Sequence, residues 1–255
     1  MTNCALCLQQ KTLKKSHVIP DAVFKRIFRA SNGQAVTFND DKDSPIDRSS
    51  DSWWEHLLCD TCEPKLNDYY ERYSLALLRG GQGKVVRHEY GVTFSKADFQ
   101  KLLLFLISIF WRAGVSNHDS YSKVYIPEPW RDQIRESILQ NRPVPLNLAT
   151  VKISRLIDTT SGGFSLEDLK SVIVTPFFRK LDGGFSFCFL LEGFFIEIFT
   201  PGLGYRQRGQ KGILNPKKSV LLVPYLSIFD APELVQLMIS GYGKHAEGNS
   251  NIKAN

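Results

Sequence analysis

Four cysteines near the start of the chain form two pairs, Cys4 with Cys7 and Cys59 with Cys62, and two residues separate the members of each pair. Thiolates at this spacing reach one tetrahedral ion, and two such pairs complete a closed structural zinc site. Four unrelated buried cysteines are the alternative interpretation, and it does not account for two matched pairs among only five cysteines. The spacing therefore predicts one structural Zn²⁺ ion.

Basic residues gather in two segments. Six basic residues and one acid lie between Lys11 and Arg29, and five basic residues and no acid lie between Gly202 and Lys218. Stripes of this kind suit contacts with a phosphate backbone. The alternatives are ordinary solvated surface and, for the second segment, a long basic connection between two strands. The candidate nucleic-acid-binding residues are Lys14, Lys15, Arg206, Arg208 and Lys211.

The composition predicts a folded cytoplasmic protein without a membrane span. Of the 255 residues 43% are hydrophobic and 23% charged, as in globular proteins. The longest apolar run, Leu102 to Trp111, is too short to cross a bilayer. The N-terminus lacks the basic and apolar regions of a signal peptide. Metal-spaced cysteines and an isolated Cys188 suit a reducing compartment better than a disulfide scaffold.

The elements that position the cysteines form a predicted unit over residues 1–80. A tight knuckle at the first cysteine pair precedes a short strand or hairpin from Lys14 to Ile19, and a polar loop is expected over residues 31–52. A helix should begin near Cys62, carry an apolar stripe, and end at two glycines, Gly80 and Gly81. This unit therefore contains all four predicted zinc ligands.

The sequence pattern divides the rest of the chain into a helical segment, an α+β domain and a tail. Residues 81–145 are predicted as a helical segment, with helices from Ser95 to about Ala113 and over 128–140. Residues 146–245 are predicted as an α+β domain with an antiparallel sheet, and 246–255 as a flexible tail. The expected strands are Val151 to Ile157, Ser171 to Phe178, Phe185 to Leu191, Phe194 to Thr200 and Val220 to Ile228. The predicted fold class is α+β.

The motif order resembles the treble-clef, or ββα-metal, scaffold of the HNH (His-Me finger) endonucleases. The resemblance covers about residues 4–75. It rests on the first C-x-x-C pair, on Ser16-His17-Val18-Ile19-Pro20, and on Leu57-Leu58-Cys59-Asp60-Thr61-Cys62-Glu63. The chain is also similar to bacterial proteins that share Ser-His-x-Ile-Pro and Leu-Leu-Cys-x-x-Cys-Glu and often lie near phage-defence genes.

The resemblance implies a metal-dependent endonuclease that cleaves phosphodiester bonds, with the four cysteines on structural zinc. His17 matches the histidine that activates the attacking water, and its near-neutral pKa suits that role. Glu63 stands at the position of the helix ligand for a catalytic ion, and a carboxylate is a suitable ligand for Mg²⁺ or Mn²⁺. The partner so implied is nucleic acid, with DNA favoured, in anti-phage defence and with a possible partner subunit of a defence complex.

The sequence departs from the family pattern at two places. Ser16 replaces the usual metal-binding aspartate, and a neutral hydroxyl is a poor ligand for a divalent ion. No asparagine precedes the second cysteine pair at the usual position; Glu55 or His56 could supply its function, as could Asn67 one helical turn after Glu63.

These departures leave two further hypotheses open. In the first, the site is inactive, His17 caps or packs the hairpin, and the chain is a zinc-finger adaptor or sensor that binds nucleic acid or a partner protein. In the second, the C-terminal α+β domain carries the main activity, although no catalytic or nucleotide-binding signature lies between Val151 and Ser240.

Overall fold

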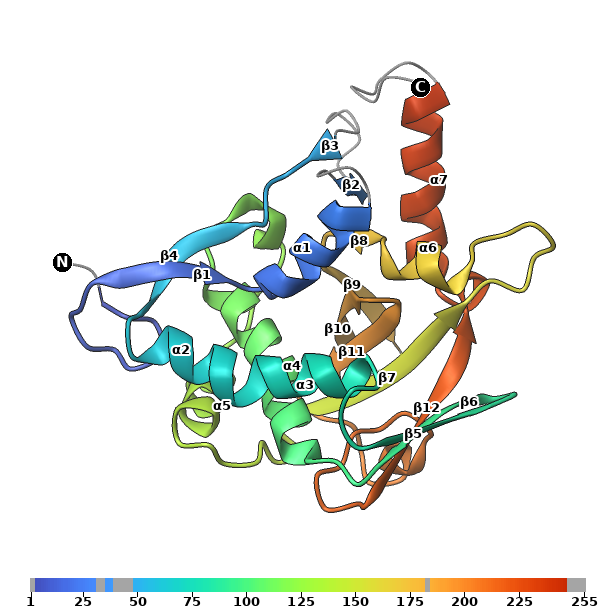
Figure 1. Ribbon diagram of the computed structural model, residues 1–255. Coiled ribbons are helices and arrows are strands. Elements are labelled where there is room, and N and C mark those ends of the chain that lie inside the picture. The colour runs from blue at the N-terminus through green and yellow to red at the C-terminus, as the bar shows by residue number, and fades with distance from the viewer. Residues whose placement is uncertain (1–2, 31–34, 39–47, 182–183, 247–255) are drawn as a thin grey trace.

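The computed structural model describes residues 3–30, 35–38, 48–181 and 184–246 (Figure 1). The chain has a mixed α+β fold with one large sheet and a cluster of four cysteines near the N-terminus, so the predicted fold class is confirmed at this level. Across these residues, no helix has both the length and the apolar character needed to cross a lipid bilayer.

The N-terminal elements enclose the four cysteines. Strand β1 (Leu13–His17) pairs antiparallel with β4 (Trp54–Cys59), and the register sets Leu13 opposite Cys59 and His17 opposite Trp54. Helix α1 (Asp21–Ala30) follows β1 and buries one face, as its helical spacing of apolar residues requires.

One continuous helical stretch follows β4 and consists of α2 (Cys62–Leu66), the π-helical turn η1 (Asn67–Glu71) and α3 (Arg72–Leu78). It begins and ends close to the predicted positions. The π-helical turn was not predicted; such turns insert one extra residue per turn and are frequent at functional sites.

Helix α4 (Phe99–Val115) lies at the centre of the molecule. Its side chains from Leu102 to Ala113 are all buried, which explains a sequence that is apolar on every face. Asp98 caps the helix by accepting a hydrogen bond from the Lys101 N–H at 3.0 Å. The helix contacts η1 and α3 on one side and β7 on another, and α5 (Trp130–Leu139) also packs against it. The short η2 (Asp119–Tyr121) lies between α4 and α5 in the chain.

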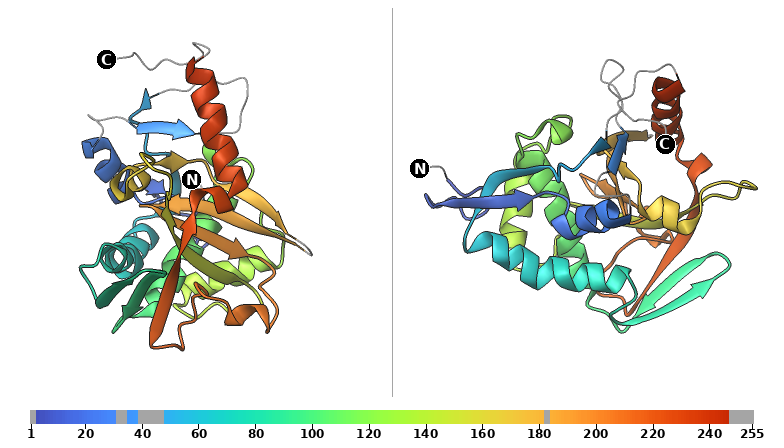
Figure 2. Two further views of the ribbon diagram at one scale, coloured as in Figure 1. Left: turned by 90° about the vertical axis from the view of Figure 1, so that its right-hand side faces the viewer. Right: turned by 45° about the horizontal axis from the view of Figure 1, so that its top comes forward.

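The large sheet has seven strands in the order β5-β6-β12-β7-β11-β10-β9. Figure 2 shows the molecule from two further sides. Only the β12–β7 pair is parallel. Its strands are β5 (Lys84–His88), β6 (Gly91–Ser95), β7 (Thr150–Ile157), β9 (Phe177–Leu181), β10 (Gly184–Leu191), β11 (Phe194–Phe199) and β12 (Val220–Ser227). The predicted strands after residue 150 are therefore present, although the run from Ser171 to Phe178 divides between β9 and a short strand, β8 (Ile173–Val174).

The β5–β6 hairpin lies inside the segment predicted as helical, residues 81–145. It pairs with β12 through β6 and so joins this segment to the sheet of the C-terminal part. The two strands of the β10–β11 hairpin were predicted, and Glu192 and Gly193 form its turn with φ values of 49° and 76°. Two consecutive positive φ angles are typical of the tight turns that match the twist of paired strands.

A second, small sheet has the order β3-β2-β8, with β2 (Ala35–Phe38) and β3 (Arg48–Ser49). Both strands fall within the predicted loop 31–52, whose residues 31–34 and 39–47 lie outside the described residues, as do 247–255 of the predicted tail. The remaining elements are α6 (Leu166–Lys170), η3 (Gln207–Gly209), η4 (Ile228–Asp230) and α7 (Pro232–Ala246).

A shared hydrophobic core connects these parts. Its largest cluster of buried side chains extends from Cys4 to Val223 and includes residues of all three predicted units. The elements that carry the cysteines are therefore packed against the central helix and the sheet, and burial on this scale is the main source of their stability.

Candidate functional site

The four sulfurs of Cys4, Cys7, Cys59 and Cys62 all lie within 4.8 Å of one another. Cys4 and Cys7 belong to a tight turn at the N-terminus, Cys59 ends β4, and Cys62 begins α2. None of the four forms a disulfide. The predicted cluster is therefore present, and its four thiol ligands could bind a metal ion such as zinc.

Local hydrogen bonds favour thiolate at one position of this cluster. Burial raises the pKa of the Cys4 and Cys62 thiols. Burial also acts to raise the pKa of Cys59, but the backbone N–H groups of Cys62 and Thr61 outweigh it and lower that pKa to about 7. In addition, the Cys59 N–H donates to Cys4 Sγ at 3.3 Å. These N–H donors are the usual support for metal-bound sulfur.

His17 ends strand β1 and is half-buried. Its Nε2 lies 3.0 Å from Ser52 Oγ and 3.9 Å from Asp21 Oδ1. Burial is the main cause of a lowered pKa for His17; Asp21 and Asp51 oppose this effect, and Arg112 and Lys25 add to it. His17 is therefore mostly neutral at pH 7, which is the protonation state that a general base requires.

Glu63 lies in the first turn of α2 and lines the same pocket as His17 and Asn67. Its Oε2 atom is buried and has no hydrogen-bond partner. Burial raises the pKa of the Glu63 carboxyl group, whereas Arg112 and the Ser16 hydroxyl act to lower it. A buried carboxylate oxygen without a partner is unfavourable, and a bound cation would satisfy it.

The pocket that these residues line is open and has a volume of about 730 Å³. Four cationic side chains line it, and they are Lys15, Lys25, Arg72 and Arg79. Of these, Lys25 pairs with Asp21, Arg72 with Asp68 and Arg79 with Glu192. Lys15 also lies over the Trp54 ring, with its Nζ 4.0 Å from the ring centre. The pocket thus places His17 and three acidic side chains, those of Asp21, Glu63 and Glu71, beside these cations, an arrangement that suits a phosphate-containing ligand.

The structure separates the remaining candidates from this pocket. Glu55 and His56 lie on β4 and do not line it. Glu55 Oε2 accepts from the Asn117 N–H at 3.2 Å, and His56 Nδ1 lies 3.3 Å from the Leu13 carbonyl oxygen. Of the three alternatives for the second ligand, only Asn67 shares the pocket with His17 and Glu63.

Ser16, which stands where the family has an aspartate, forms hydrogen bonds with the backbone of the two paired strands. Its side chain is buried, and Oγ accepts from the Leu58 N–H at 3.1 Å and donates to the Lys14 carbonyl oxygen at 3.3 Å. These bonds connect β1 to β4 next to His17. Among the residues described by the structure, the four cysteines are the only group of three or more Cys, His, Asp or Glu ligands that lie this close together.

Two residues that support His17 were not identified from the sequence. Arg112, in α4, is fully buried; its Nη1 donates to the His17 carbonyl oxygen at 2.5 Å and its Nη2 to Glu71 Oε1 at 2.7 Å. Glu71 belongs to the π-helical turn η1. Arg112 follows directly after the apolar run and lies within α4. A charged residue in an otherwise apolar, buried helix usually has a partner, so the sequence could have indicated a buried ion pair at this position.

The predicted basic loop lies apart from this site. Arg206, Arg208 and Lys211 do not line the pocket that contains His17. Arg208 Nε donates to the Leu203 carbonyl oxygen at 2.7 Å, and Lys211 Nζ lies 5.4 Å from the Tyr90 ring centre. Of the first basic segment, Lys14 is exposed, and Lys15 is at the pocket border.

Comparisons with protein-family models, with curated proteins and with solved structures find no match to this chain.

Proposed function

We propose that this protein is a metal-dependent endonuclease of the HNH type that hydrolyses phosphodiester bonds in nucleic acid, with DNA as the favoured substrate. One observation carries the proposal: His17, Glu63 and Asn67 line one open pocket, and that pocket is bordered by cationic side chains. The pocket also lies next to the four-cysteine cluster, because Glu63 follows Cys62 directly.

The order of local elements supports a treble-clef arrangement. A cysteine knuckle precedes β1, β1 pairs antiparallel with β4, and the helix starts at Cys62. In this arrangement the four cysteines hold Zn²⁺, which is the ion that tetrahedral four-thiolate sites prefer in proteins. The ion would fix β4 and α2 together, and so fix Glu63 relative to His17.

The residues of the pocket have separate roles in hydrolysis. Neutral His17 accepts a proton from the attacking water at Nε2, the ring nitrogen beside Ser52 and Asp21. Glu63, with its unpartnered Oε2, and Asn67 would hold a divalent ion, Mg²⁺ or Mn²⁺. That ion, when bound, neutralises charge on the reacting phosphate and leaving oxygen.

The surrounding cations orient the nucleic acid. Lys15 would contact a phosphate of the nucleic acid at the pocket border, and Lys25 and Arg72 would do so by exchanging their partners Asp21 and Asp68 for phosphate oxygens. The Arg206–Lys211 loop is a separate candidate contact for a longer nucleic acid. As part of the same proposal, the motifs shared with bacterial proteins near phage-defence genes support a role in anti-phage defence together with a partner subunit.

The experiment is a plasmid-nicking assay with Mg²⁺ or Mn²⁺ that compares the wild type with His17→Ala, His56→Ala and His88→Ala. His88, on β5, bonds to Thr93 and lies outside the pocket, so its replacement serves as the control. The proposal predicts that only His17→Ala abolishes nicking. Loss of nicking in His56→Ala with retention in His17→Ala would assign the base to His56, and equal nicking by all variants would reject His17 as the general base.

Glu63→Gln tests the proposed ligand for the catalytic ion. Replacement of the carboxylate by a neutral amide should raise the Mn²⁺ concentration needed for half-maximal nicking, because the amide binds a hard cation more weakly. Asp60→Asn is the matched control, since Asp60 is exposed and lies outside the pocket. An unchanged metal dependence in Glu63→Gln would remove Glu63 from the metal site.

A second candidate function is a zinc-stabilised adaptor or sensor without catalysis. It is favoured by the structural bonding of Ser16 and by the absence, within the described part of the chain, of a second preformed cluster of three Cys, His, Asp or Glu ligands. Under this alternative, no variant of the pocket changes nucleic-acid or partner binding, and no metal restores cleavage. Binding that survives in a His17→Ala, Glu63→Gln double variant, together with no nicking by the wild type, would establish the adaptor.

A further inference from the structure

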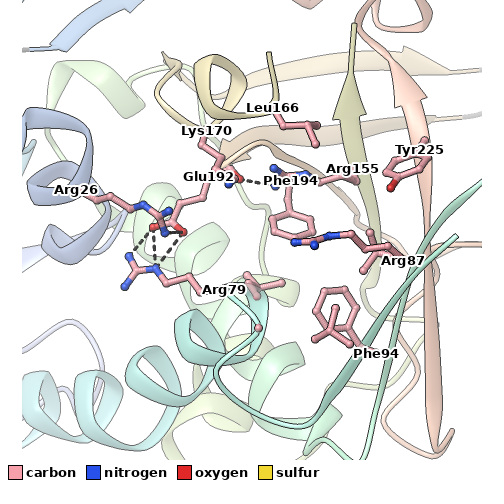
Figure 3. A pocket seen from close by; sticks show the side chains of 14 residues that line it. Arg26, Arg79, Arg87, Phe94, Arg155, Leu166, Lys170, Glu192, Phe194 and Tyr225 are labelled. Carbon is pink, nitrogen blue, oxygen red and sulfur yellow. Dashed lines mark hydrogen bonds and ion pairs between the residues drawn. The ribbon is translucent and has the colours of Figure 1, made fainter. Parts of the chain in front are cut away.

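A second pocket lies between α1, the end of α3, the β5–β6 hairpin and the centre of the large sheet (Figure 3). Its volume is about 130 Å³. A single carboxylate, that of Glu192, lines the pocket together with an excess of cationic side chains. These cations are Arg26, Arg79, Arg87, Arg155 and Lys170.

The carboxylate of Glu192 accepts hydrogen bonds from two arginines. Arg79 Nε lies 3.0 Å from Oε2 of Glu192, and Arg26 Nη1 lies 3.2 Å from the same oxygen. Figure 3 shows both guanidinium groups converging on it. Glu192 is therefore not available to neutralise the other cations of the pocket.

Arg155 is a buried cation whose charge is not neutralised. It lies on β7, opposite Phe194 of β11 on one side and Tyr225 of β12 on the other, and is only 7% exposed. Its guanidinium donates one hydrogen bond, from Nη1 to the Glu192 carbonyl oxygen at 2.6 Å, and lies over the Phe194 ring. No carboxylate among the described residues forms an ion pair with it. A guanidinium has five N–H donors, so most of its donors remain unused.

Arg155 lacks the carboxylate partner that another buried arginine, Arg112, has. Both arginines are buried, but Arg112 has the Glu71 carboxylate at 2.7 Å and Arg155 has none. Burial lowers the pKa of Arg155 and the neighbouring Arg87 adds to this effect, whereas the charges of Glu167 and Glu192 act to raise that pKa. A buried charge in this position is costly unless an anion accompanies it.

We infer that this pocket binds the phosphate group of a small ligand, either inorganic phosphate or pyrophosphate, or a nucleotide. Arg155 forms the floor of the site and contacts the phosphate through its free N–H donors. Arg87 from β5 and Lys170 from α6, which also pairs with Glu167, close the rim. Arginine is the side chain whose planar donors best match phosphate oxygens.

The test is isothermal titration of the full-length chain with phosphate, pyrophosphate, ATP and adenosine at low salt. The main variant is Arg87→Gln, because the exposed Arg87 side chain has no hydrogen bond or ion pair among the described residues and its loss should not affect folding. Lys84→Gln is the matched control: it removes the same charge from the same strand, but Lys84 alternates to the other face and does not line the pocket.

The inference predicts saturable binding of at least one phosphate-bearing probe and no binding of adenosine. Arg87→Gln should weaken this binding on the order of tenfold, as for loss of one charged hydrogen bond, and Lys84→Gln should leave it within about twofold. Arg155→Lys, which keeps the charge and loses the planar fork, should also weaken it. Tighter binding of ATP than of pyrophosphate identifies a nucleotide, and the reverse identifies the inorganic ion.

The inference is overturned if the wild type binds none of the phosphate-bearing probes, if adenosine binds as tightly as ATP, or if both Gln variants lose the same affinity. None of these outcomes depends on nuclease activity, because Arg87 and Arg155 do not line the pocket of His17.

Discussion

Replacement of Glu71 by Gln tests whether the buried ion pair with Arg112 holds the His17 strand in place. The Arg112 side chain is 1% exposed and that of Glu71 is 10% exposed, so water screens their interaction poorly. The same guanidinium donates to the His17 carbonyl oxygen, and it thereby connects α4, η1 and the end of β1. Glu71→Gln keeps the shape of the side chain and removes only its charge.

The expected loss follows from leaving Arg112 buried without a counter-charge. Removal of one partner from a buried ion pair typically costs about 3–5 kcal/mol of unfolding free energy. Because the Gln amide oxygen can still accept a hydrogen bond from Arg112, we expect a value near the lower limit, about 3 kcal/mol. For a chain of this length, that loss lowers the melting temperature by roughly 6–12 °C.

The assay is urea unfolding followed by circular dichroism at a fixed Zn²⁺ concentration, since a metal that binds the folded state contributes to the measured stability. Asp68→Asn is the control, because Asp68 lies in the same π-helical turn and pairs with Arg72 at 3.4 Å, but both side chains are exposed. The control should lose about 0.5 kcal/mol or less. A loss below about 1 kcal/mol in Glu71→Gln, or one equal to the control, would refute the reasoning about the buried pair.

Three other predictions concern the metal site, the histidine and the basic loop. Purified protein should contain one tightly bound zinc per chain by elemental analysis, and Cys59→Ser should lose the metal and unfold at lower temperature, because metal binding stabilises the fold; a metal-free folded wild type would contradict this. Because the pKa of His17 is lowered in the folded state, its contribution to stability is present above the unfolded pKa of about 6.5 and is lost as pH falls through the folded pKa. The unfolding free energy of His17→Ala should therefore decline less than that of the wild type below about pH 6.5, and parallel declines would refute the assignment. If the loop contributes to nucleic-acid binding, alanine at Arg206, Arg208 and Lys211 together should reduce the slope of log affinity against log salt by up to about three units, whereas an unchanged slope would reassign the loop.

The four-cysteine cluster and most of the strands could be predicted because they depend on local sequence. The C-x-x-C spacing alone brings each pair of sulfurs together, and alternating or continuous apolar runs such as Val151 to Ile157 have the length and composition of strands. Helix α4 was also predicted, although it begins at Phe99, with Asp98 as its cap, rather than at Ser95. In each case the relevant interaction lies within a few residues in the chain.

The features that were missed depend on contacts between distant segments. The β5–β6 hairpin is stabilised by pairing with β12, more than a hundred residues away, and its exposed strand β5 has no continuous apolar run. In the sequence, Arg112 is a charged residue that follows an apolar run, and only the tertiary packing brings it into contact with Glu71 and His17. Arg155 was part of a strand pattern, and its burial beside Glu192 follows from strand order, which the sequence does not specify.

The central claim is that His17 acts as the general base in nucleic-acid cleavage, and the most direct measurement is the single-turnover cleavage rate of His17→Ala relative to the wild type. Both proteins are loaded with zinc, saturated with Mn²⁺, and shown to have melting temperatures that agree within about 4 °C, the shift that a loss of about 1 to 2 kcal/mol produces. The account predicts a rate at least about a hundredfold lower for His17→Ala, because a general base contributes at least that factor. Equal rates for the two proteins would contradict it.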